Sequence, residues 1–165
     1  MEEVLNDQGK PRKIFIPEGL VIPTFHCIGE AIRIRRFDSG ERPYHTVTGS
    51  CTSPLIVGEL GRPIVLVESD LDAWLIYQEA GDIVTVSSLG SAGTKPDPVL
   101  AAFLLAAPQI LVALDNDKAG REASQKWART FPKAKLWPVP WGTDPGEAFG
   151  STPRLVMEWI ELGLR

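Results

Sequence analysis

The sequence predicts an α/β protein, with a mainly parallel sheet flanked by helices and a small β-rich subdomain at the N-terminus. From Pro63 onward, short apolar runs alternate with segments of helical spacing, which is typical of strand–helix–strand units. Before Gly58, short β-type runs follow one another, separated by turn residues. Hydrophobic residues make up 44% of the chain and charged residues 23%. This composition is ordinary for a globular protein and excludes a disordered or fibrous one.

The β-rich subdomain is expected to cover residues 1–62. Its strands are expected at residues 20–25, 31–37, 44–48 and 55–57, because each run is rich in apolar or β-branched residues and ends at turn residues. Gly40 suits a hairpin turn between the second and third of these strands. The composition changes at residues 58–63 (GELGRP), where we place the end of the subdomain.

The α/β domain is expected to cover residues 63–165. Its strands are expected at residues 64–67, 83–86, 110–114 and 136–139, and its helices at residues 69–80, 98–107, 119–130 and 154–162. Residues 64–67 (IVLV) are apolar without a break, which is typical of a strand covered on both faces. Periodicity alone also allows a buried strand at residues 98–107, and Gly163 is expected to follow the last helix.

Several classes of protein are excluded or disfavoured. The longest apolar stretch, residues 99–107, is far shorter than the roughly 20 residues that span a membrane. The acidic start of the chain lacks an apolar signal segment, so we expect a cytoplasmic protein. Two cysteines, Cys27 and Cys51, cannot form a disulfide framework or a four-ligand zinc site. The neighbouring His26 would point to the opposite face of a strand from Cys27, which disfavours a chelating pair.

Charge is distributed unevenly along the chain. Residues 1–62 carry 8 basic and 8 acidic side chains, whereas residues 63–165 carry 9 basic and 13 acidic ones. An acidic second half argues against simple wrapping of a phosphate backbone, but it allows a carboxylate site that holds metal ions.

Acidic residues follow three of the expected strands in the α/β domain. Glu68 follows residues 64–67, with Asp72 one helical turn later, and Asp115 and Asp117 follow residues 110–114. Asp144 lies in the loop after residues 136–139. Carboxyl ends of parallel strands meet at one edge of a sheet, where crowded carboxylates need cations such as Mg²⁺. Alternatively, these residues cap the helices that follow them.

Three segments carry a resemblance to a known family: residues 67–73 (VESDLDA), 114–120 (LDNDKAG) and 142–147 (GTDPGE). They resemble the motifs of Toprim domains, which occur in DNA primases, topoisomerases, recombination-mediator proteins and OLD-type nucleases. The primase forms read Glu-Gly-x-x-Asp-Ala, Asp-x-Asp-x-Ala-Gly and Gly-x-Asp-Pro-x-Glu, and the chain departs from them at Ser69, where glycine is usual. The match covers about residues 63 to 150.

The resemblance implies a divalent metal site, with Mg²⁺ or Mn²⁺ held by the carboxylates Glu68, Asp72, Asp115, Asp117 and Asp144. Asp115 and Asp117 resemble the metal-binding pair, Asp72 and Asp144 resemble supporting carboxylates, and Glu68 also resembles the general acid or base. Glu147 is the last acidic residue of the third motif. Ala119 and Gly120 are expected to let the helix start close to the sheet, because both side chains are small.

The N-terminal part also resembles primases, which have a β-rich subdomain before the Toprim domain. The resemblance is carried by residues 19–25 and 31–37. Arg33 and Arg35 would lie on one face of a strand, where they are expected to contact template phosphates. A solvated edge strand, whose cations discourage aggregation, is the alternative for these two residues.

The function that this resemblance implies is a metal-dependent nucleotidyltransferase, the core of a bacterial or phage-type DNA primase that synthesises RNA primers. Its partners would be a single-stranded DNA template, NTPs, the RNA primer and a replicative helicase, with no membrane. A zinc-binding module is expected elsewhere, so the chain is expected to be a fragment with weak activity or none by itself. Two alternatives stay open: a Toprim nuclease similar to OLD-type enzymes, and a non-catalytic nucleic-acid-binding module.

Overall fold

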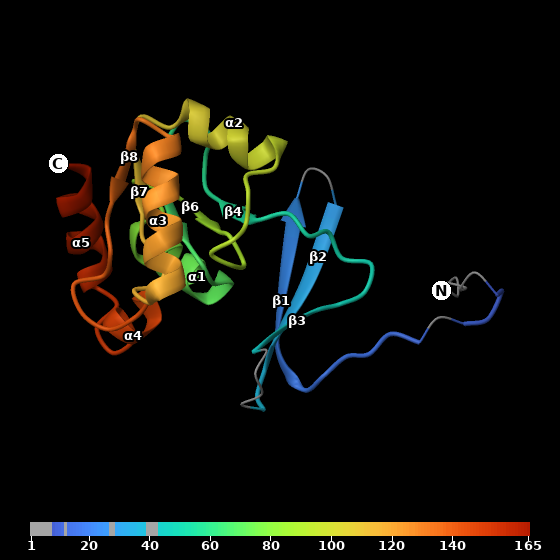
Figure 1. Ribbon diagram of the computed structural model, residues 1–165. Coiled ribbons are helices and arrows are strands. Elements are labelled where there is room, and N and C mark those ends of the chain that lie inside the picture. The colour runs from blue at the N-terminus through green and yellow to red at the C-terminus, as the bar shows by residue number, and fades with distance from the viewer. Residues whose placement is uncertain (1–7, 12, 27–28, 39–42) are drawn as a thin grey trace. The chain divides into compact units, whose positions relative to one another are not determined.

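The chain forms two compact units, residues 1–53 and 54–165, in the computed structural model shown in Figure 1. The structure describes residues 8–11, 13–26, 29–38 and 43–165. The second unit has a mainly parallel sheet flanked by helices, and the first has an antiparallel sheet, which confirms the predicted fold class. The expected turn at Gly40 and the residue Cys27 lie outside the described residues.

The first unit contains three antiparallel strands in the order β1-β2-β3: β1 Gly19–His26, β2 Gly29–Arg36 and β3 Tyr44–Thr46. Residues paired across the strands share a face, as Ile22 and Arg33 do. Both of these are buried, whereas Val21 and Ile32 on the opposite face are exposed. Because β2 is the middle strand, the edge-strand interpretation of Arg33 and Arg35 is wrong.

The second unit has a five-stranded sheet in the order β4-β6-β5-β7-β8. The strands are β4 Leu55–Val57, β5 Ile64–Val67, β6 Thr85–Ser88, β7 Ile110–Val112 and β8 Ala134–Leu136. All neighbours pair in parallel except β4, which runs antiparallel to β6. The helices are α1 Asp70–Ala80, α2 Pro98–Ala106, α3 Lys118–Thr130, α4 Pro145–Phe149 and α5 Leu155–Leu164.

The core of this unit lies on both faces of the sheet, as the unbroken apolar run of β5 predicts. Val65 and Val67 pack into a cluster with residues of α1, α4 and α5. Ile64 and Leu66 point the other way, into a cluster with residues of α2 and α3. The helices therefore cover the two faces of the sheet, as can be followed in Figure 1. The segment around residues 98–107 is a helix, not the buried strand that periodicity also allowed.

The break between the two units falls before the expected position. Residues 55–57, which we expected in the β-rich subdomain, form β4 and pair with β6 in the α/β sheet. The turn after β4 depends on Gly58, which has a φ of +120° and lies against Thr85 of β6. A Cβ atom at Gly58 would lie 2.6 Å from the Thr85 hydroxyl oxygen, so this close approach requires glycine.

Several elements of the second unit also differ from the expected ones. β6 begins two residues later than expected and ends with Ser87 and Ser88, which are fully buried although polar. β7 ends at Val112, and β8 lies earlier than the expected strand at 136–139. Residues 145–147, expected in the loop after residues 136–139, lie in the short helix α4, and Gly163 lies inside α5. Among the described residues, no helix is long and apolar enough to cross a membrane.

Candidate metal and active site

The register of the central strands brings two carboxylates to one edge of the sheet. Leu66 of β5 pairs with Val112 of β7, and the backbone N–H of Ala113 donates to the Leu66 carbonyl at 2.9 Å. Because the two strands are parallel, the chain reaches Glu68 and Asp115 at the same edge. From the sequence we expected the acidic residues that follow these strands to meet at one edge of the sheet, and the register agrees with this expectation.

Asp115 lies at the centre of the acidic cluster, which consists of Glu68, Asp72, Asp115, Asp117 and Asp144. Burial, together with repulsion from the other four carboxylates, raises the pKa of Asp115 to about 7. Charges that repel strongly enough to change a pKa must lie close together. The five acidic residues predicted from the sequence are therefore neighbours in space, around one half-buried aspartate.

Glu68 has a buried oxygen atom that the described residues leave unsatisfied. Its Oε1 is inaccessible to solvent and accepts no hydrogen bond from any residue that the structure describes. Burial raises the pKa of Glu68, and the charge of Asp117 adds to this effect, whereas backbone groups of Asp115 and Ala92 oppose it. A buried carboxylate oxygen without a partner is unfavourable, so this atom is placed to receive a cation or a proton.

Gly120 lets helix α3 begin next to Asp115 and Glu68. A Cβ atom at this position would lie 2.0 Å from the Asp115 carbonyl oxygen and 3.0 Å from Oε1 of Glu68. The backbone N–H of Gly120 donates to Oδ1 of Asp117 at 2.7 Å, which caps α3. The predicted packing role of Gly120 is thus confirmed, whereas that of Ala119 is wrong, because Ala119 is exposed to solvent.

Asp72 joins two helices that are distant in sequence. Its Oδ2 accepts from the Ser69 hydroxyl at 2.5 Å, and its Oδ1 accepts from the Gly146 backbone N–H at 2.8 Å. Burial raises the pKa of Asp72, the Ser69 hydrogen bond opposes that rise, and the charge of Asp144 adds to it. With both oxygens engaged, Asp72 holds the start of α4 against α1.

Asp144 caps α4 and leaves one oxygen with little engagement. Its Oδ1 accepts from the Glu147 N–H at 2.7 Å, while Oδ2 lies 3.5 Å from the Thr143 hydroxyl. Glu147 folds back on the loop, and its hydrogen bonds from Thr143 lower its pKa. The Asn116 N–H donates to the Thr143 carbonyl at 2.6 Å, so this loop is tied to the residues after β7.

Both interpretations of the acids, as helix caps and as metal ligands, are compatible with these contacts. Asp117 and Asp144 each use one oxygen as a cap, which leaves the second oxygen for another partner. The unsatisfied Oε1 of Glu68 and the all-oxygen ligand set fit Mg²⁺ or Mn²⁺. Within residues 43–165 and the other described ranges, no group of three or more His, Cys, Asp or Glu side chains is arranged so that it could hold a metal ion. Mg²⁺ commonly binds only one or two carboxylates and keeps several waters, so it does not require three protein ligands in place.

The two arginines predicted to bind nucleic acid lie in the first unit, in different surroundings. Arg33 is only 9% exposed, and its Nη2 donates to the Ser53 carbonyl at 3.0 Å. Arg35 is half-buried, and its guanidinium carbon lies 5.2 Å from the centre of the Tyr44 ring. Of the two, Arg35 has the more accessible side chain.

Sequence reasoning overlooked the residues that fix the loops of the site. Ser69 caps α1 and binds Asp72, and the Ser-x-x-Asp spacing of a capping box was the signal for this pair. Gly146 donates its N–H to Asp72 across the fold, and no local pattern could indicate that contact.

Comparison with known proteins places these residues in a family context. The model of the Toprim-like family matches residues 65–148. The Gene 57 protein of Mycobacterium phage D29 is 30% identical over 117 residues, which are 69% of this chain and 74% of that protein.

Solved structures of primases have the same fold. The RNA polymerase domain of Mycobacterium tuberculosis primase DnaG matches 99% of this chain and 59% of its own, with 20% identity and a TM-score of 0.66. The primase fragment of the bacteriophage T7 primase-helicase protein matches 96% of this chain and 61% of its own, with 18% identity and a TM-score of 0.57. The chain therefore spans about three-fifths of the length of these two structures.

Proposed function

The chain belongs to the Toprim-like family, and from that premise we propose that it is the core of a DNA primase. In this proposal it is a metal-dependent nucleotidyltransferase that joins NTPs into an RNA primer on a single-stranded DNA template. The observation that carries the proposal is the set of acidic residues at one edge of the sheet, where Gly120 brings α3 against Asp115 and Glu68 and where four neighbouring carboxylates repel Asp115. The fold shared with primase structures, which extends to residues before the family match, supports it.

Three residues would hold the metal in this proposal: Asp115, Asp117 and Glu68. When bound there, Mg²⁺ or Mn²⁺ neutralises the triphosphate and stabilises the charge that develops on the transferred phosphorus. Asp72 and Asp144 support this site in different ways. Asp72 holds the α4 backbone through Gly146, and Asp144 has one oxygen, Oδ2, whose contact with the Thr143 hydroxyl is only a long one of 3.5 Å.

Glu68 would act as the general acid or base. It lies at the end of a buried strand, and its Oε1 is unoccupied by any hydrogen bond from the described residues. Glu68 as a whole is half-buried, and a carboxyl group that is partly accessible can take a proton from an attacking hydroxyl or give one to a leaving group. Burial and the neighbouring charge both favour its protonated form when no cation is present.

The first unit would bind the template. Arg35 would contact backbone phosphates, and Arg33 would contribute from the same face of β2. These contacts carry no sequence information, because phosphates are the same at every base. A replicative helicase remains a proposed partner, by analogy with a primase fragment that belongs to a primase-helicase protein.

The test is a product assay with the full chain, Mg²⁺, NTPs and two substrates: a single-stranded template and a template with an annealed RNA primer. Extension of the annealed primer does not require initiation, so it also detects a core that depends on a separate module for template capture. We expect longer RNA on the annealed substrate, and we expect the Asp115→Asn variant to abolish this extension. Asp82→Asn, an exposed acid in the turn after α1, is the control and should extend normally.

Other products would identify the alternatives. Fragments of the template would indicate a nuclease, because the same metal site can direct water instead of a hydroxyl group. Template binding without any new product would indicate a non-catalytic module. Either result contradicts the proposed transferase activity.

A further inference from the structure

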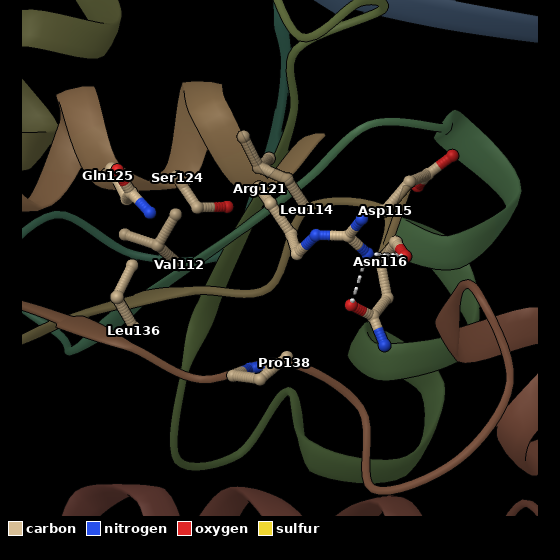
Figure 2. Close-up of a pocket in the computed structure, with 9 residues that line it drawn as sticks. All are labelled: Val112, Leu114, Asp115, Asn116, Arg121, Ser124, Gln125, Leu136 and Pro138. Carbon is tan, nitrogen blue, oxygen red and sulfur yellow. Dashed lines mark hydrogen bonds between the residues drawn. The ribbon is translucent and has the colours of Figure 1, made fainter. Parts of the chain in front are cut away.

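A pocket of about 180 Å³ opens next to the acidic cluster, between α3 and β8. Figure 2 shows the residues that line it. Its floor is formed by two buried side chains, Val112 at the end of β7 and Leu114 two residues later. One side is apolar and is formed by Leu136 and Pro138. Asp115 also lines the pocket, so the pocket is continuous with the acidic edge of the sheet.

The opposite side of the pocket is polar and comes from helix α3. Ser124 and Gln125 present a hydroxyl and an amide to the pocket. In the part of the chain that the structure describes, neither side chain has a hydrogen-bond partner. The pocket thus combines an apolar floor with a few donors and acceptors that are not engaged, which is typical of small-molecule sites.

Arg121 lies at the end of the pocket nearest Asp115. Its Nη1 donates to the Asn116 carbonyl at 2.5 Å and lies 3.2 Å from Asn116 Oδ1, the contact drawn in Figure 2. These bonds hold the guanidinium beside the acidic edge while using only one of its three nitrogens. A positive charge at this place can contact a phosphate or a ribose oxygen without displacing any protein contact.

We infer that this pocket binds the nucleoside part of a nucleotide whose phosphates lie at Asp115. The inference rests on the proposed function and extends it to the recognition of the substrate. The apolar floor suits the faces of a purine or pyrimidine ring, and Ser124 and Gln125 suit polar atoms of the nucleoside. Val112 lies three residues before Asp115, at most about 10 Å along an extended chain. That span is comparable to the reach from a base to its 5′-phosphate, and the pocket is too small for a folded peptide segment.

The first experiment separates the nucleoside from the phosphates by NMR on the ¹⁵N-labelled full chain. Adenosine, guanosine, cytidine and uridine are titrated without metal, and inorganic tripolyphosphate is titrated with Mg²⁺. We expect nucleosides to shift the amide signals of Ser124, Gln125 and Leu136, with a Kd on the order of 1 mM, as for a weakly held small ligand. We expect tripolyphosphate to shift the signals of Asp115 and Asp117 and to leave those of Ser124 and Gln125 unchanged.

The second experiment fills the pocket. Ser124→Phe should weaken nucleoside binding at least tenfold and leave tripolyphosphate binding unchanged. Lys126→Phe puts the same ring on an exposed part of α3 outside the pocket, and it should bind nucleosides as the unmodified chain does. Gln125→Ala, at an exposed position, gives a second variant that removes an amide without adding volume.

The outcomes are distinguishable. If nucleosides shift no pocket signal while tripolyphosphate still binds with Mg²⁺, the inference is wrong and the proposed function stands. If nucleoside binding survives Ser124→Phe in a folded protein, the nucleoside binds elsewhere and the inference is wrong. If neither nucleosides nor tripolyphosphate bind, the inference and the proposed transferase both fail.

Discussion

In the α/β unit, the charged residues of the candidate site lie at the ends of strands and the starts of helices. In the three-stranded unit, by contrast, Arg33 and Arg35 lie within a strand. Backbone geometry alone brings the first group together, because parallel strands end at a common edge. The surroundings of the arginines depend on what packs against each position of β2. Arg33 is buried against Ser53, and Arg35 lies over Tyr44, although both share one face.

The difference shows which functional residues a sequence can locate. A residue at a strand end has its position fixed by the topology, so its neighbours can be predicted from the strand pattern. A residue within a strand has only its face fixed, and its exposure depends on contacts that are distant in sequence.

The largest effect is expected for the double variant Asp115→Asn/Asp117→Asn. Removing both charges from the centre of the acidic cluster should abolish binding of Mn²⁺, measured by calorimetric titration, because a hard cation needs ionised oxygen ligands. Asp82→Asn is the control and should bind Mn²⁺ normally. If the double variant binds Mn²⁺ as the unmodified chain does, the metal binds elsewhere, and the acidic residues at the strand ends do not form the site.

Glu68→Gln is expected to lower the rate of primer extension by about 10²–10⁴-fold, the usual contribution of a general acid or base. Mn²⁺ binding should survive, because glutamine keeps the shape and one oxygen. Rates are measured on the annealed primer-template, with calorimetry on the same preparation. If the variant no longer binds Mn²⁺, the main role of Glu68 is that of a metal ligand. If the rate is unchanged, Glu68 does not transfer a proton in the reaction.

Gly120→Ala tests whether the site depends on the close approach of the start of α3 to Asp115 and Glu68. The added Cβ would lie 2.0 Å from the Asp115 carbonyl oxygen, so we expect the free energy of unfolding to fall by about 1–3 kcal/mol. Gly93→Ala is a matched control, because a Cβ there meets nothing within 4 Å, and it should change stability by less than about 0.5 kcal/mol. Chemical denaturation measures both. Equal stability of the two variants would show that α3 can move away from the sheet without cost.

Arg33→Ala and Arg35→Ala test the three-stranded unit. Arg33→Ala should lower the free energy of unfolding by about 1–3 kcal/mol, because the Ser53 carbonyl loses its charged donor. Arg35→Ala should change the free energy of unfolding by no more than about 1 kcal/mol, the strength of a cation–π contact that is not fully buried. It should also lower the slope of log affinity for DNA against log salt concentration by about one unit. A salt slope that falls for Arg33→Ala without loss of stability would restore Arg33 as a phosphate contact.

The smallest effect is on the pH dependence of stability in the metal-free protein. The pKa values of Asp115, Glu68 and Asp72 are all raised on folding, with that of Asp115 at about 7. The folded state therefore binds more protons than the unfolded state between about pH 4 and 7, and stability falls as pH rises through this range. In EDTA, we expect the Tm to be roughly 2–4 °C lower at pH 8 than at pH 6. Asp115→Asn should flatten this dependence, and a Tm that rises with pH would contradict the crowding of the acids.

Much of the α/β unit could be predicted from the sequence, because its central strands have an unmistakable pattern. The apolar run of β5 predicted a strand covered on both faces, and the acids after β5 and β7 predicted a common edge. The sequence placed β6 two residues too early, because the buried end of this strand is polar. The Ser88 hydroxyl donates to the buried carboxylate of Asp70, and a hydropathy pattern does not reveal such a pair. α4 was missed because five residues with proline and glycine resemble a loop.

The remaining differences come from contacts between distant segments. β4 pairs with a strand that follows it by one strand and one helix, so its local pattern could not assign it to the α/β sheet. The burial of Arg33 depends on the Ser53 carbonyl, which is 20 residues away in sequence. Sequence periodicity reports the face of a strand but not what covers it.

The hydrogen bond from Gly146 to Asp72 also has a consequence for the order in which the protein folds. It closes a loop of 74 residues, and loop closure of this size costs entropy that local contacts do not. Helix α1 and the central strands can therefore form during synthesis while α4 is still absent. The acidic edge is completed only when the last part of the chain arrives, and amide hydrogen exchange at Gly146 would report that step separately from the formation of the sheet.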